Sequence, residues 1–140
     1  MCRNSRRVVN GQDGNGSGRG VKGGGEGCVL EGRNRTGVTL TNLVHADRTP
    51  ADRELHHDPV EGPLILHPPK NGSIFRIVQF DPEDPGVLAK LDGKAAFAEM
   101  GAGANVVEGA RQPFMHRTES VDKATILYGE HYKQLGRGEQ

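Results

Sequence analysis

The sequence predicts an all-β protein, organised as a sandwich or barrel. Stretches rich in β-branched and aromatic residues recur along the chain with two-residue alternation, and they amount to about six or seven strands. Clusters of Gly, Pro, Asn and Asp separate these stretches, and a helical pattern appears only over one short segment. Many short strands with turn residues between them are typical of sandwiches and barrels.

The length and composition predict a single domain with a small core. The chain has 140 residues, which is an ordinary size for one domain. Only 34% of the residues are hydrophobic and 4% are aromatic, while 21 are glycines that raise the backbone entropy lost on folding. We therefore expect marginal stability for the isolated chain, with a partner or a missing segment needed to complete the core.

The charge balance excludes several classes of partner. Eighteen basic and eighteen acidic residues cancel, so the general attraction to nucleic acid or to an anionic membrane is missing. No apolar stretch approaches the roughly 20 residues of a membrane span, and the N-terminus lacks the apolar run of a secretory signal. With Cys2 and Cys28 expected as free thiols, the sequence favours a protein of a reducing, cytoplasmic compartment.

Residues 1–35 are expected to form a flexible, glycine-rich N-terminal segment. Ten of the 22 residues from 11 to 32 are glycines, a composition that favours a loop over regular structure. Gly18, Gly20 and Gly23 match the spacing of a dinucleotide-binding fingerprint, but more glycine follows where that motif needs a helix. No cofactor-binding residue is therefore assigned here.

The first strand is expected in "TGVTLTNLVHAD", residues 36–47, where apolar and polar residues alternate. Residues 49–63 then read as a polar loop. His56, His57 and Asp58 in this loop have the residue types of a metal site, but neighbouring side chains on an extended chain point to opposite faces. A solvated loop is the preferred interpretation.

A β-hairpin is expected next. Its strands would be "GPLILHPP", residues 62–69, and "SIFRIVQF", residues 73–80, joined by an Asn-Gly turn. After it, "LAKLDGKAAFAEMG" predicts one short helix at residues 94–100, ended by Gly101. Residues 36–104 are accordingly expected to form an N-terminal β-hairpin region with one short helix.

Residues 105–140 are expected to supply the remaining strands, at 105–114 and 120–135, with Gly129 and Glu130 at a turn or bulge. Two further expectations concern individual side chains. Arg76 and Glu108 are expected on solvated faces. The expected core residues are Phe75, Ile77, Val106, Ile126 and Leu127.

The candidate site lies in "PFMHRTESVDKATILYGEH", residues 113–131. On an extended strand His116 shares one face with Thr118, Ser120 and Asp122, a set that offers one imidazole and one carboxylate. Two protein ligands seldom hold a transition metal without help from elsewhere. A lone histidine where a strand begins is also commonly a surface or capping residue.

This stretch resembles the first barrel motif of the cupin superfamily, in the branch of small single-domain proteins common in fungi. The likeness rests on "HRTESVD" at residues 116–122, then on Ile126, Leu127, Gly129 and Glu130. Segments upstream resemble the same branch in the same order, among them "RRVVNGQDGNG", "GVTLTNL", "GSIFRIVQF" and "NVVEGARQPFMHRT". The likeness covers most of the chain outside residues 16–27.

The resemblance implies a double-stranded β-helix, or jelly roll, preceded by an N-terminal β-strand extension and incomplete at the C-terminus. By position, His116 matches the first histidine of the cupin motif, Thr118 stands where the second would be, Asp122 replaces the glutamate and Gly129 matches the glycine. A divalent metal is possible on this basis, with His116 as its ligand, although the motif is incomplete. The unpaired edge of a shortened barrel would favour dimerisation.

The resemblance also implies a role in fungal secondary metabolism. Cupins of this branch are associated with polyketide gene clusters, where they are thought to act on aromatic or reduced polyketide intermediates as oxidoreductases, dehydratases or decarboxylases. In this hypothesis His116 is the general base or metal ligand, Asp122 orients it or accepts a proton, and Arg117 or Thr118 contacts a substrate oxygen. The alternatives are a small barrel that binds a ligand without chemistry and the inactive product of a truncated gene.

Overall fold

The chain is mostly strand, with short helices, in a computed structural model that describes residues 6–25, 29–52, 57–110 and 112–131. Its elements follow in the order β1 (Arg6–Gln12), β2 (Gly18–Gly25), β3 (Val29–Glu31), β4 (Val38–Ala46), β5 (Ser73–Phe80), α1 (Pro85–Leu88), α2 (Gly93–Glu99) and the 3-10 turn η1 (Gly103–Asn105). The strands form a two-stranded sheet, β1-β2, and a three-stranded sheet, β3-β4-β5, both antiparallel. The all-β prediction is confirmed at this level, and the cupin jelly roll stays a prediction.

Strand β4 lies where the alternating sequence of residues 36–47 predicts a strand, and it is the centre of the larger sheet. It pairs with β3 on one side and with β5 on the other. Leu40, Thr41 and Asn42 are buried in succession, and the register with β5 shifts between Asn42 and Val44. This irregularity is a β-bulge, which changes the face that the following residues present.

Strand β5 is found where the sequence predicts it, but its partner is different. Residues 62–69 were expected to pair with it, and β4 takes that place instead. Three of the eight residues from 62 to 69 are prolines, which lack the N–H group that a ladder requires. The hairpin prediction is therefore wrong, and this segment is an irregular connection.

The turn before β5 requires a glycine for a steric reason. Asn71 adopts a left-handed conformation with φ of 67°, and the Gly72 N–H donates to Pro69 O at 2.9 Å. A Cβ atom on Gly72 would lie 2.3 Å from the carbonyl oxygen of Ala46. The absent side chain lets the beginning of β5 lie directly beside the end of β4.

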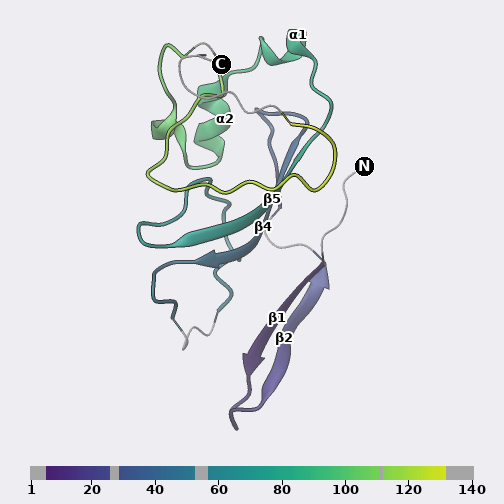
Figure 1. Ribbon diagram of the computed structural model, residues 1–140, viewed down its shortest axis with the longest axis vertical. Helices are drawn as coiled ribbons and strands as arrows, with labels where there is room; N and C mark the ends of the chain where they lie inside the picture. The colour runs from purple at the N-terminus through teal and green to yellow at the C-terminus, as the bar shows by residue number, and fades with distance from the viewer. Residues whose placement is uncertain (1–5, 26–28, 53–56, 111, 132–140) are drawn as a thin grey trace.

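The glycine-rich segment contains strands in place of the loop expected for residues 11–32. Strands β1 and β2 pair antiparallel, and Figure 1 shows their hairpin extending away from the larger sheet. Asp13 organises the turn, since its Oδ1 accepts from the N–H groups of Asn15 and Ser17, each at 3.0 Å, and Gly16 takes a φ of 76°. Glycine supplies the same backbone donors and acceptors as other residues, so this ladder forms without side-chain packing.

The helix predicted at residues 94–100 is confirmed as α2. The Asp92 carboxylate accepts from the Ala95 N–H at 3.1 Å at its beginning, and Gly101 follows its end with a φ of 66°. Asp84 caps α1 in the same way, and Figure 1 shows both helices at the end of the molecule opposite the hairpin. None of the helices in the described ranges has the length and apolarity to cross a membrane.

The core is small and is formed by residues of β4, of α2 and of the connections beside them. Its buried apolar members are Leu40, Val60, Leu64, Ala96, Phe97 and Ala102. Three residues predicted for the core are instead exposed: Phe75 by 62%, Ile126 by 54% and Leu127 by 80%. Two-residue alternation predicts that the two faces of a strand differ in burial, but it does not predict which face a neighbouring element covers.

The strands expected at 105–114 and 120–135 are not formed by the described residues. Residue 105 ends η1, Val106 makes a single antiparallel bridge with His116, and residues 121–127 have no regular structure. A strand needs a neighbouring backbone to satisfy its polar groups, and no described strand pairs with 121–127. Residues 132–135 of the second expected strand lie outside the described ranges.

Candidate functional site

The backbone around His116 is held by a short ladder to residues 105–107. The Val107 N–H donates to Met115 O at 3.0 Å, and the Arg117 N–H donates to Asn105 O at 2.8 Å. The Asn105 side-chain amide also donates to Arg117 O at 2.9 Å. These hydrogen bonds hold the backbone of His116 in place, although His116 belongs to none of the strands β1 to β5.

The His116 ring is oriented by one hydrogen bond and one aromatic contact. Its Nδ1 lies 3.1 Å from the carbonyl oxygen of Phe114. A carbonyl oxygen only accepts, so Nδ1 carries the proton and, in the neutral ring, Nε2 carries the lone pair. The ring packs at 4.8 Å from the Phe97 ring, tilted by 43°. Because His116 is exposed, its Nε2 atom is accessible and can act as a base or as a metal ligand.

An aromatic and a charged side chain hold Phe114, whose carbonyl oxygen accepts the hydrogen bond from His116. The rings of Phe97 and Phe114 lie 6.4 Å apart, and the Arg35 guanidinium lies 4.4 Å from the centre of the Phe114 ring. Arg35 is itself paired with Glu83. The cation–π contact and the ion pair hold Phe114, whose carbonyl in turn orients His116.

Asp122 belongs to a chain of hydroxyl groups and has no hydrogen bond to His116 among the described residues. The Ser120 hydroxyl donates to Asp122 Oδ1 at 2.9 Å, and the Thr118 and Ser120 hydroxyl oxygens lie 2.8 Å apart. Since Ser120 has only one hydroxyl proton and gives it to the carboxylate, Thr118 is the donor of the second bond. These three side chains thus come together, although residues 117–122 do not form the strand on which they were expected to share a face with His116. The roles of His116 and Asp122, and of the exposed Arg117, stay predictions.

The described residues do not fit a metal centre of the cupin type. No group of three or more His, Cys, Asp or Glu side chains comes together within the ranges that the structure describes. His116 offers one nitrogen ligand, and the Asp122 carboxylate is engaged by Ser120. No chemical step is therefore assigned to a metal ion.

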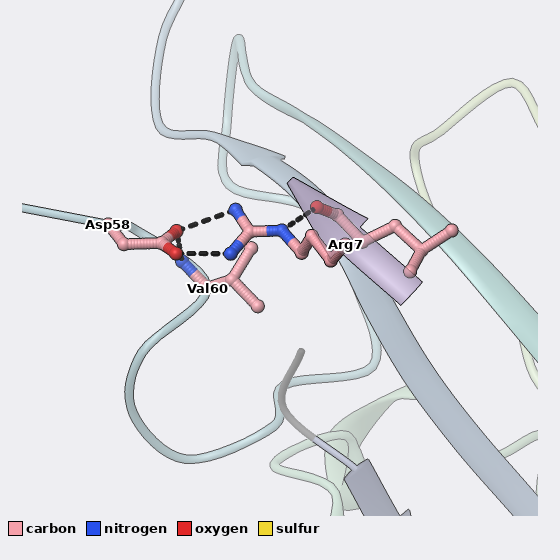
Figure 2. A network of polar contacts seen from close by, with 4 residues as sticks. Arg7, Asp58 and Val60 are labelled. Atoms are coloured by element: carbon pink, nitrogen blue, oxygen red, sulfur yellow. Dashed lines mark hydrogen bonds and ion pairs between the residues drawn. The ribbon is translucent and has the colours of Figure 1, made fainter. Parts of the chain in front are cut away.

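A second polar site joins β1 to the loop after β4, and Figure 2 shows it from close by. Both Nη atoms of Arg7 donate to the Asp58 carboxylate, the Nη2–Oδ1 distance being 2.8 Å, and Arg7 Nε donates to Leu43 O at 2.5 Å. The two side chains are only 16% and 9% exposed. The hydrogen bond to Asp58 raises the pKa of the Arg7 guanidinium above its ordinary value.

This pair corrects the interpretation of residues 49–63 as a solvated loop, at least for Asp58. His57 is exposed as expected, and His56 lies outside the described residues. Arg7 and Asp58 are 51 positions apart in the sequence, so no local pattern could have indicated their contact.

Arg76 is the second charged residue whose expected exposure is wrong. Its Nε donates to Asn42 Oδ1 at 2.8 Å, while Nη1 and Nη2 donate to Leu66 O at 3.0 Å and Ile65 O at 2.8 Å. Arg76 thus binds the proline-rich connection to the sheet. Glu108, by contrast, is exposed as predicted and lies 3.5 Å from Lys94.

Glu99 joins α2 to the turn between β3 and β4. Its carboxylate accepts from the Arg33 N–H at 3.2 Å, the Asn34 N–H at 3.1 Å and the Asn34 side-chain amide at 3.3 Å. These donors favour the ionised form and lower the pKa of Glu99 below its ordinary value of 4.5, with the Asn34 backbone as the largest cause. The carboxylate therefore binds the turn most strongly when ionised.

We expect this contact to make stability fall in acid. A depressed pKa in the folded protein stabilises it above the pKa of the unfolded chain, and this contribution disappears as the pH falls through the folded value. Thermal unfolding measured from pH 6 to pH 3 should show a smaller loss of Tm for Glu99→Gln than for the unmodified protein. Glu108→Gln is the matched control and should follow the unmodified protein. Parallel curves for all three proteins would contradict the prediction.

Comparisons with known proteins give no further assignment of the site. No protein-family model, curated protein or solved structure matches the chain. The geometry around His116 and the residue pattern of 116–122 are therefore what supports a function.

Proposed function

We propose that this chain is a cupin-type protein of polyketide metabolism in which His116 acts as general base on a small aromatic or reduced polyketide intermediate. The observation that carries the proposal is the hydrogen bond from His116 Nδ1 to Phe114 O, because it leaves the Nε2 lone pair free to take a proton. The contact with Phe97 keeps the ring in this orientation. The "HRTESVD" pattern supplies the link to the cupin branch.

Dehydration is the reaction that these side chains support best among the three classes implied by the resemblance. His116 Nε2 would remove a proton from the carbon next to a carbonyl group, and the bond to the β-hydroxyl group would break as the carbon–carbon double bond forms. The His116 imidazolium would return the proton to the departing hydroxyl group, which leaves as water. Arg117 follows His116 on the opposite face of the extended chain, and its long, exposed side chain would turn to the carbonyl oxygen and stabilise the negative charge that develops there. Each of these steps is a proton transfer or a charge contact, for which imidazole and guanidinium groups suffice.

A second function is favoured by the aromatic cluster itself. Phe97, Phe114 and His116 place three rings close together, with the His116 ring exposed at the surface. A planar aromatic ligand could stack on such a surface and be held there without chemistry. In this case His116 would contribute to binding alone.

Measuring dehydration and binding in parallel separates the two functions. The purified full chain would be given a β-hydroxyacyl thioester, and the conjugated product would be followed by its ultraviolet absorbance. For a general base we expect His116→Ala to lower kcat by roughly a hundredfold or more, with KM changing little. The exposed His57→Ala is the matched control and should keep full activity. An unchanged rate of dehydration in His116→Ala would remove the catalytic role. Binding of a planar aromatic ligand by a protein that does not turn over the thioester would also remove it.

A further inference from the structure

The β1–β2 hairpin has little apolar surface with which to attach itself to the rest of the chain. In the part of the chain that the structure describes, no strand or helix outside the hairpin packs extensively against it. Val8 on β1 is 54% exposed, and β2 is largely glycine. An isolated two-stranded hairpin is marginally stable in water at best. Its order must therefore depend on a specific contact elsewhere.

Arg7 supplies such a contact through three hydrogen bonds to the body of the protein. Two go to the Asp58 carboxylate and one to the backbone carbonyl of Leu43 in β4. A two-point contact between guanidinium and carboxylate fixes the relative orientation of the two groups as well as their distance. Because both side chains are largely buried, water and salt compete with the pair only weakly.

Asp58 also stabilises a turn in its own loop. Its Oδ1 also accepts from the Val60 N–H at 3.0 Å, and the Glu61 N–H donates to Asp58 O at 2.9 Å. These bonds close a turn over residues 58–61 and bury Val60, which is only 4% exposed. Figure 2 shows the Asp58 carboxylate bonded both to the Arg7 guanidinium and to the backbone nitrogen of Val60. One carboxylate oxygen thus serves the turn and the hairpin together.

We propose that the β1–β2 hairpin is a detachable arm, with the Arg7–Asp58 ion pair as its clasp, and that the 58–61 turn prepares the carboxylate that receives it. The turn holds the Asp58 carboxylate in place before the arm arrives, and Arg7 binds it at two points. Loss of either charged partner releases the arm, since the two-point contact that fixes the arm is then broken. The core around α2 is unaffected by this release.

Hydrogen–deuterium exchange on the full chain tests the clasp. For Asp58→Asn and for Arg7→Met, amides in residues 6–25 should exchange roughly tenfold faster or more, because a released hairpin loses its order. Amides in β4 and β5 should keep their rates in both variants. The double variant should exchange no faster than either single one, since both changes break the same contact.

The turn is tested by comparing two changes at Asp58. Asn keeps a side-chain oxygen that can accept from the Val60 N–H, whereas Ala removes it. Asp58→Asn should therefore leave the Val60 amide protected, and Asp58→Ala should expose it. Glu108→Gln, which removes the charge of an exposed ion pair, is the control and should change neither region.

Two results would overturn the proposal. Unchanged exchange of residues 6–25 in Asp58→Asn and Arg7→Met would show that the hairpin does not depend on the pair. Acceleration spread equally over the hairpin and β4 would show that the pair supports the whole fold. Either result would leave the proposed role of His116 untouched, because none of these variants alters residues 114–122.

Discussion

Replacing Gly93 by alanine is expected to destabilise the protein by about 3 kcal/mol, the upper end for an overpacked interior. Gly93 is the first residue of α2 and is buried. A Cβ atom at this position would lie 1.8 Å from the carbonyl oxygen of Pro113 and 2.7 Å from its carbonyl carbon. These are backbone atoms, so α2 or the 112–116 segment would have to move. Urea unfolding followed by circular dichroism measures the loss.

The same substitution at Gly103 provides the control for Gly93→Ala. Gly103 also begins a helical turn, but its Cβ would meet Ala98 at 3.4 Å, an ordinary contact distance. Alanine there should change stability by less than about 1 kcal/mol, with a possible gain from the lower entropy of the unfolded chain. Equal midpoints for the two variants would contradict the close packing of α2 on Pro113.

The elements that could be predicted from the sequence are those determined by local pattern. Strand β4 follows from alternation, and α2 follows from its alanine-rich run between an Asp cap and a terminal glycine. The β1–β2 hairpin was not predicted, because a glycine-rich composition argues against strands unless a turn aligns two backbones. Asp13 supplies that turn, and the signal for it was present in the sequence "DGNGS".

Pairings between distant segments could not be predicted. Strand β5 carries the right pattern for a strand, but that pattern is equally compatible with a partner at 62–69 or at 38–46. The contact between Arg7 and Asp58 similarly depends on how the whole chain folds. Charged residues were expected to be solvated. This expectation fails for charged side chains that bind backbone carbonyl groups or buried carboxylates.

The candidate site was located by its motif, but its supporting residues were not. The sequence placed His116, Thr118, Ser120 and Asp122 on one strand face, and the structure brings the last three together without a strand. The sequence did not indicate that Phe97, within a helix 19 positions away, would contact the His116 ring. Apolar residues in a helix predict burial and say nothing about which functional side chain they will support.

Replacing Phe97 by alanine is expected to destabilise the protein by about 3–5 kcal/mol, the range for removing a large aromatic side chain from a core. Phe97 is only 4% exposed and is the largest side chain among the buried residues. It also contacts the rings of Phe114 and His116, so the change removes the packing that orients the candidate base. Urea unfolding measures the stability, and NMR signals of the His116 ring report its loss of order.

Two further variants separate burial from support of His116. Phe97→Leu keeps most of the apolar volume and should lose about 0.5–1.5 kcal/mol from the aromatic contacts, together with the ring-current shift of His116. Phe75→Ala removes an equally large ring from a site that is 62% exposed and should change stability by less than about 1 kcal/mol. If Phe97→Ala and Phe75→Ala unfolded at the same urea concentration, Phe97 would not be the centre of the core. If Phe97→Leu left the His116 signals unchanged, the ring would be held by the Phe114 carbonyl alone, and α2 would have no part in orienting the base.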